Sequence, residues 1–313
     1  MRPRFALLIA LVLATVALTY AGSHFVLPAP PPAVHAALPP GAASYLGVFE
    51  AGSPPGYQPV AGFATAAGRR PNLVGYFSGW AEPFKASFAA KMHAHDAIPF
   101  VQIDPTLANV PDIAAGDYDG YLSSYADSVR DFGYPVVIGF GHEMNAPTYP
   151  WGYGKLAPSA FVAAWRHIVS LFRSEGAGNV TWLWTINADR PGTGPIAAWW
   201  PGAKYVTWVG IDGYYYRPSD TFASVFGTTI DQLRKFTGKP VLLSETAVGP
   251  RAGQFVKIGN LFAGVLQYKA LGLVWFDKTQ RGSIYHQNWR IEGDLTAERA
   301  IQLGVSELRL AQP

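Results

Sequence analysis

The sequence predicts an α/β fold, a (β/α)8 TIM barrel, and three observations carry this prediction. Short apolar runs alternate with helix-like segments from residue 44 onward. There are eight such runs, which is the number of strands that closes a parallel barrel of this type. No change of composition divides residues 44–313, so we expect them to form a single domain.

The predicted strands are runs of four to six residues, and most are rich in β-branched or aromatic side chains. They are nearly continuously apolar, which is typical of parallel strands buried on both faces. In chain order, the strands are predicted at residues 45–49, 73–77, 98–103, 136–140, 181–185, 206–211, 241–244 and 272–276.

Helical patterns lie between these runs, at residues 117–129, 158–174, 253–271 and 296–310. Pro158 suits a first helical turn, because the N–H that proline lacks would have no partner there. An open, doubly wound sheet is the structural alternative. It is less favoured, because the glycines in residues 52–56 lack the spacing of a phosphate-binding loop.

Charge and cysteine content narrow the function classes. The chain has 24 Lys and Arg against 21 Asp and Glu and no long basic run, which argues against binding to nucleic acid. Aromatic residues make up 14% of the chain, a content that suits sugar rings as ligands but also a large core. The absence of cysteine excludes disulfides, thiol catalysis and cysteine metal sites. No metal motif is visible, and we expect no cofactor.

The first 43 residues predict export. Arg2 and Arg4 precede an apolar run over residues 5–18, which is the pattern of a signal peptide. Weaker apolar character continues further, so residues 1–27 are either a cleaved signal peptide or an uncleaved membrane anchor. Residues 28–43 are rich in Pro and Ala and form a spacer. In both cases the rest of the chain is expected to be extracellular or at the cell envelope.

Two glutamates stand at the ends of predicted strands, where the active site of such a barrel lies. Glu143 follows the fourth strand and Glu245 follows the seventh, so the two carboxylates should face each other across the barrel mouth. Glycoside hydrolysis needs such a pair, one to protonate the leaving oxygen and one to meet the charge at the anomeric carbon. A gap of about 5–5.5 Å gives retention, and a wider gap gives inversion.

The residues around Glu143 resemble a known family. His142-Glu143-Met144-Asn145-Ala146, with Trp151 shortly beyond, is similar to the strand-4 signature His-Glu-Met-Asn-Gly of glycoside hydrolase family 26. Residues 205–214, 240–245, 274–277 and 288–291 are similar to later segments of that family, so the resemblance extends over residues 44–305. It implies a (β/α)8 catalytic domain and a retaining mechanism on β-linked polysaccharides, most often β-1,4-mannan.

The resemblance also implies roles for single residues. Glu143 would be the acid/base and Glu245 the nucleophile. Tyr214 would hydrogen-bond the nucleophile, His142 would contact the sugar or hold Glu143, and Trp275 would lie beneath the reacting ring. Since aromatic faces suit the apolar face of a pyranose, two further tryptophans are candidate platforms. The substrate-binding set is then His142, Asn145, Tyr214, Trp275, Trp80 and Trp151.

We therefore expect a monomeric, retaining, endo-type β-glycosidase whose partner is a polysaccharide or oligosaccharide, with β-1,4-mannan as the first substrate to test. Gly139 stands where many members of the family have Arg, and Thr148 stands where an aromatic residue is usual. These departures leave other readings open. They are hydrolysis of β-1,3-xylan, β-glucan or a cell-wall glycan, and a non-catalytic barrel that binds glycans.

Overall fold

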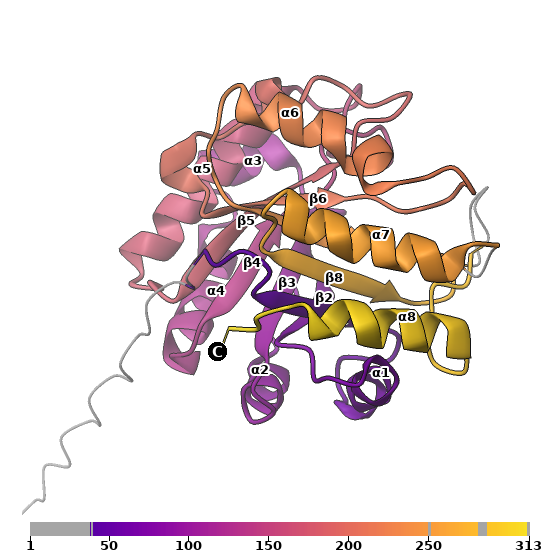
Figure 1. Ribbon diagram of the computed structural model, residues 1–313. Coiled ribbons are helices and arrows are strands. Elements are labelled where there is room, and N and C mark those ends of the chain that lie inside the picture. The colour runs from indigo at the N-terminus through magenta and orange to yellow at the C-terminus, as the bar shows by residue number, and fades with distance from the viewer. Residues whose placement is uncertain (1–37, 39, 250–251, 281–286, 312–313) are drawn as a thin grey trace, which may run out of the picture. The chain divides into compact units, whose positions relative to one another are not determined.

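A computed structural model describes residue 38 and residues 40–249, 252–280 and 287–311 of the chain (Figure 1). The expected signal peptide or anchor of residues 1–27 and most of the spacer lie outside these residues. Within the described part, none of the helices combines the length and the apolar character that crossing a membrane requires.

Eight parallel strands close into a barrel in which each strand pairs with its neighbours in chain order and β8 pairs with β1. The predicted fold class is confirmed. The strands are β1 (Tyr45–Glu50), β2 (Leu73–Gly79), β3 (Ile98–Asp104), β4 (Val136–Phe140), β5 (Val180–Asn187), β6 (Trp208–Asp212), β7 (Val241–Thr246) and β8 (Gly272–Asp277).

Helices pack around the outside of the strands (Figure 1). They are α1 (Gln58–Ala67), α2 (Ala86–His93), α3 (Val110–Ala115), α4 (Asp119–Phe132), α5 (Pro158–Ser174), α6 (Thr228–Arg234), α7 (Gln254–Gln267) and α8 (Leu295–Ser306). The bounds predicted for α5 are confirmed, whereas α7 and α8 end earlier than predicted. The prediction for β6 began too early, because a 3-10 turn at Ala203–Tyr205 precedes that strand.

Side chains alternate between the barrel interior and the layer beneath the helices, as the twofold period of a strand requires. Phe49 of β1, Phe100 of β3 and Val274 of β8 belong to the interior cluster. Phe77 and Phe276 pack against the same cluster but stay partly exposed. Trp275, one residue along, belongs to the cluster that includes the helices. Side chains therefore fill the interior of the barrel. The carboxyl ends of the strands form the mouth above this packed interior.

We predict that Gly272→Ala destabilises the β1–β8 pairing that closes the barrel. Gly272 starts β8 at φ +149°, and a Cβ there would overlap the carbonyl oxygen of Tyr45 on β1. Because backbone must move, the free energy of unfolding should fall by about 2–4 kcal/mol. Gly259→Ala, on an open face of α7, is the matched control and should be neutral or stabilising by up to about 1 kcal/mol. Equal unfolding curves for the two variants in denaturant would contradict this reading.

Candidate active site

Glu143 and Glu245 lie at the carboxyl ends of β4 and β7, and both are buried, with 8% and 6% of their surfaces exposed. Burial raises the pKa of Glu143 above its usual range. Burial also raises the pKa of Glu245, and the charge of Glu143 adds to this, so that it reaches about 7. The ionisation of Glu245 is therefore coupled to the charge of Glu143.

The backbone at Glu143 has a conformation that side chains rarely adopt, with φ +54°. Its N–H donates to the Thr185 carbonyl oxygen on β5 at 3.0 Å, and its own carbonyl accepts from Ala146 N–H at 2.9 Å. A left-handed residue other than glycine costs about 1–3 kcal/mol and persists only where its surroundings impose it. The position of the Glu143 side chain is therefore obtained at a cost in the stability of the fold.

Tyr214 holds one oxygen of Glu245. Its hydroxyl donates a hydrogen bond of 2.6 Å to Glu245 Oε2, which lowers the pKa of that carboxyl against the effect of burial. Glu245 Oε1 is buried and has no hydrogen-bond partner within the described residues. The neighbouring Tyr215 is directed elsewhere, because its hydroxyl donates to Asn260 on α7. Tyr214, and not Tyr215, is therefore the tyrosine that hydrogen-bonds Glu245.

The His142 ring connects two groups at the mouth. Its Nδ1 lies 2.9 Å from Asp104 Oδ1 and its Nε2 lies 3.0 Å from the Tyr149 hydroxyl. Burial by itself lowers the pKa of His142. The hydrogen bond and charge of Asp104, with the charges of Glu245 and Glu143, outweigh burial and raise that pKa to about 9. His142 is therefore a cation at neutral pH, and its charge in turn lowers the pKa of Glu143 and Glu245.

Gly139, where the family resemblance leads us to expect arginine, has no room for a larger side chain. It pairs in register with Gln102, and a Cβ on Gly139 would overlap the Gln102 side-chain oxygen. Gln102 is fully buried and donates from Nε2 to Thr185 Oγ1 at 3.0 Å. Positive charge reaches Glu143 from other positions instead, since His142 and Arg190 both lower its pKa.

Comparison with known sequences agrees with this geometry. The profile described as "Glycosyl hydrolase family 26" matches residues 80–290, which is more than half of the chain and includes both glutamates. The chain belongs to this family.

Two relatives of similar sequence are named after different polysaccharides. Endoglucanase H of Acetivibrio thermocellus is 26% identical over 257 residues, covering 77% of this chain and 28% of that protein. Mannan endo-1,4-beta-mannosidase A and B of Caldalkalibacillus mannanilyticus is 27% identical over 99 residues, covering 29% of this chain and 19% of that protein. The chain thus spans less than a third of the length of either relative.

A family 26 β-mannanase from Bacteroides ovatus has a similar structure, with a TM-score of 0.63 and 14% identity. The match covers 86% of this chain and 90% of that one. At this identity, the likeness shows that the two proteins share the barrel fold.

Three other predicted binding residues occupy supporting positions in this family member. Asn145 donates to the Asn187 carbonyl at 2.9 Å and accepts from the Asn187 N–H at 2.8 Å, which ties the β4 and β5 ends together. Trp151 is 2% exposed, donates to the His142 carbonyl at 2.8 Å, and stacks parallel to Tyr149 with ring centroids 4.6 Å apart. Trp80 is 8% exposed and packs against aromatic rings of the α4 region.

Trp275 also lies away from the open mouth. It is 1% exposed, and its indole N–H donates to the Trp289 carbonyl at 2.8 Å. Its neighbour Phe276 is partly exposed and meets the Tyr214 ring edge to face, with centroids 5.8 Å apart.

Sequence reasoning missed several residues at the mouth. Phe77 lies beside His142, with ring centroids 5.4 Å apart. Lys278 Nζ lies 5.0 Å from the Phe77 ring centroid and 5.2 Å from that of Phe276. Burial lowers the pKa of Lys278, and the charges of Glu245 and Glu50 oppose this. Phe77 and Phe276 occupy strand positions whose side chains point into the barrel. The alternation of side chains along β2 and β8 could therefore have predicted both from the sequence.

A second acidic group was also missed. Glu50, Asp277 and Glu292 each offer one carboxylate oxygen, and these atoms lie within 4.8 Å of one another. Among the described residues, this trio is the one grouping of three acidic, His or Cys side chains with the spacing of a metal site.

We predict that Glu245→Gln stabilises the protein at alkaline pH. The pKa of Glu245 is about 7 in the fold and near 4.5 when unfolded, so the fold binds this proton more tightly. Stability is therefore lost as the pH rises from 4.5 to 7, and glutamine, which does not ionise, avoids the loss. The variant should gain about 1–3 kcal/mol in unfolding free energy at pH 8 and almost nothing at pH 4.5.

The control for this measurement is the exposed Glu307, whose Gln variant should match the parent at both pH values. Chemical denaturation at the two pH values checks the prediction. A Glu245→Gln protein that is no more stable than the parent at pH 8 would show that the buried carboxylate is not destabilising.

Proposed function

We propose that this chain is a retaining endo-β-glycosidase that hydrolyses a β-linked polysaccharide, with Glu143 as the acid/base and Glu245 as the nucleophile. One observation carries the proposal. A family 26 barrel brings two buried, coupled carboxyl groups to the ends of β4 and β7, and one of them is hydrogen-bonded by a tyrosine. A pair of this kind matches the two carboxyl groups that glycoside hydrolysis requires.

The coupled titration supports a division of labour. In the first step Glu245 attacks the anomeric carbon while Glu143 gives its proton to the leaving oxygen, so the glycosidic bond breaks and a glycosyl ester forms. The ester carries no negative charge, so the pKa of Glu143 falls. Glu143 then takes a proton from water as the water attacks the anomeric carbon, which releases the sugar and restores both carboxyl groups.

The hydrogen bonding of Glu245 supports one of its oxygens as the nucleophile. Tyr214 occupies Oε2, whereas Oε1 has no partner within the described residues. We assign the attack to Oε1, with Tyr214 holding the carboxylate and lowering its pKa so that it ionises more readily.

Partly exposed aromatic rings at the mouth are the proposed sugar-binding surfaces. Phe77 and Phe276 lie at the top of the interior cluster, and Tyr149 stands beside His142. Their faces suit the apolar face of a pyranose ring. Trp151, which is almost fully buried, would support Tyr149 from behind by stacking on its ring.

β-1,4-Mannan is the first proposed substrate, because the family resemblance and the named mannan-degrading relative both point to it. β-Glucan is the second, because the relative matched over 77% of the chain is an endoglucanase. A screen of the purified protein against mannan, mixed-linkage glucan, β-1,3-xylan and cell-wall polysaccharides, read by product mass, separates them. No hydrolysis of any polymer, together with glycan binding, would favour the non-catalytic barrel.

We also propose that the protein works outside the cytoplasm, either released or anchored at the envelope. The basic and apolar pattern of residues 1–27 supports this, and polymeric glycans are substrates met outside the cell.

We predict that the two glutamates can be told apart by chemical rescue. Glu143→Ala and Glu245→Ala should each lower kcat by roughly 10³–10⁶-fold, because each removes a group that acts in the transition state. With an activated aryl β-glycoside and azide, Glu245→Ala should yield the glycosyl azide of inverted configuration. Glu143→Ala should yield the retained configuration, because its covalent intermediate still forms. NMR of the products measures the outcome.

Glu307→Ala, at an exposed position, is the control and should keep full activity. Full activity of Glu245→Ala, or azide products of the opposite configurations, would reverse or remove the assignments.

We predict that Tyr214→Phe shifts the acid limb of the pH–rate profile to higher pH. The Tyr214 hydrogen bond lowers the pKa of Glu245, so its loss raises that pKa, and Glu245 then needs a higher pH to ionise. We expect kcat/KM to fall by about 10–100-fold below the optimum. Tyr215→Phe, which removes a hydroxyl bonded to Asn260, is the control. Identical pH profiles for Tyr214→Phe and the parent would contradict the role.

A further inference from the structure

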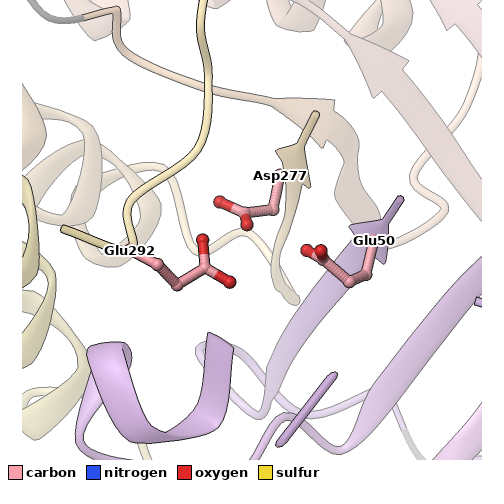
Figure 2. A group of neighbouring side chains, drawn as sticks. All are labelled: Glu50, Asp277 and Glu292. Atoms are coloured by element: carbon pink, nitrogen blue, oxygen red, sulfur yellow. The ribbon is translucent and has the colours of Figure 1, made fainter. Parts of the chain in front are cut away.

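Three carboxyl groups from distant parts of the chain meet where the barrel closes. Glu50 ends β1, Asp277 ends β8, and Glu292 precedes α8. Figure 2 shows their side chains pointing toward a common space, and one oxygen from each lies within 4.8 Å of the others. The group lies outside the catalytic pair proposed above.

Glu50 and Asp277 are buried, and all three carboxylates are incompletely satisfied. Glu50 is 2% exposed and Asp277 is 0% exposed. Glu50 Oε2, Asp277 Oδ2 and Glu292 Oε2 are buried and have no hydrogen-bond partner among the described residues. Buried charge that is neither paired nor hydrogen-bonded is strongly unfavourable, so these oxygens require a positive partner or protons.

Neighbouring protein groups satisfy only part of this need. Arg290 Nη2 lies 3.3 Å from Glu292 Oε1, and the Ile291 N–H donates to Asp277 Oδ1 at 2.9 Å. Lys278 lies over phenyl rings, at 5.0–5.7 Å from their centroids. These contacts leave the unpartnered oxygens of the three carboxylates facing one another.

We propose that Glu50, Asp277 and Glu292 bind one hard divalent cation, with Ca²⁺ as the best fit. An all-oxygen donor set without His or Cys selects hard cations. Calcium–oxygen distances of about 2.3–2.6 Å allow two ligand oxygens to lie up to about 4.6–5.2 Å apart, which is compatible with three oxygens that all lie within 4.8 Å of one another. Mg²⁺ usually keeps several waters and binds only one or two carboxylates, whereas three protein carboxylates suit the larger oxygen shell of Ca²⁺. Water would complete the coordination shell.

The bound cation would join the two ends of the barrel. Glu50 and Asp277 are register partners in the β1–β8 pair, and Glu292 belongs to the segment that leads into α8. One ion therefore connects the first strand, the last strand and the approach to the last helix. The proposed role of the ion is structural. The proposal does not depend on whether the protein carries out the proposed hydrolysis.

Metal content and binding test the proposal directly. Elemental analysis of the purified full chain, followed by calorimetric titration of chelator-treated protein with CaCl₂, should give one Ca²⁺ per chain. Saturating Ca²⁺ should raise Tm by roughly 3–8 °C, because it binds the folded state alone. KCl at equal ionic strength should not reproduce the shift.

Matched variants locate the site. Glu50→Gln and Asp277→Asn should abolish the calorimetric signal and the Ca²⁺-dependent rise in Tm, and Glu292→Gln should weaken binding at least tenfold. Glu307→Gln, an exposed control, should bind as the parent does. If the Asp277 variant fails to fold, Glu292→Gln carries the test, because its side chain is 22% exposed and tolerates change better.

Absence of saturable binding of Ca²⁺, Mg²⁺ or Mn²⁺ to the parent would overturn the proposal and leave shared protons to neutralise the group. Binding that persists unchanged in all three variants would also overturn it, because the ion would then lie elsewhere.

Discussion

Closure of the sheet between β1 and β8 is the constraint on which the rest of the structure depends. The two strands stay in parallel register from Tyr45 opposite Gly272 to Glu50 opposite Asp277. Closure removes both edges of the sheet and assigns every side chain to the interior or the outer layer. Because all eight strands run the same way, their carboxyl ends open on one mouth. A glutamate after β4 and another on β7 thereby lie at the same mouth, where the charge of Glu143 raises the pKa of Glu245.

Concentrating carboxyl groups at that mouth works against stability. Burial raises the pKa of both glutamates, the charge of Glu143 raises that of Glu245 further, and burial also raises the pKa of Asp212 at the end of β6. The left-handed backbone of Glu143 adds a further cost. A closed barrel with a packed interior can bear these costs, and coupled carboxyl groups are the arrangement that proton transfer at neutral pH requires.

Positive charge lies beside Glu143 although the arginine that many family members have at position 139 is absent. Gly139 excludes an arginine because Gln102 fills the adjacent interior space. His142, held between Asp104 and Tyr149, carries positive charge beside Glu143, and Arg190 adds to it. The sequence shows that this arginine is missing, but not that His142 is charged. A histidine's charge depends on neighbours that are distant along the chain, so spacing does not reveal it.

By itself, the sequence determined the barrel, the order of its strands and the glutamate pair. These follow from apolar runs and from the strand ends at which Glu143 and Glu245 stand, which are local properties. Only the tertiary structure decided that Tyr214 faces Glu245, and that Phe276 and not Trp275 reaches the open mouth. Only it brought Glu50, Asp277 and Glu292 together. Side-chain direction and burial depend on strand register and closure, and these join segments that no local pattern connects.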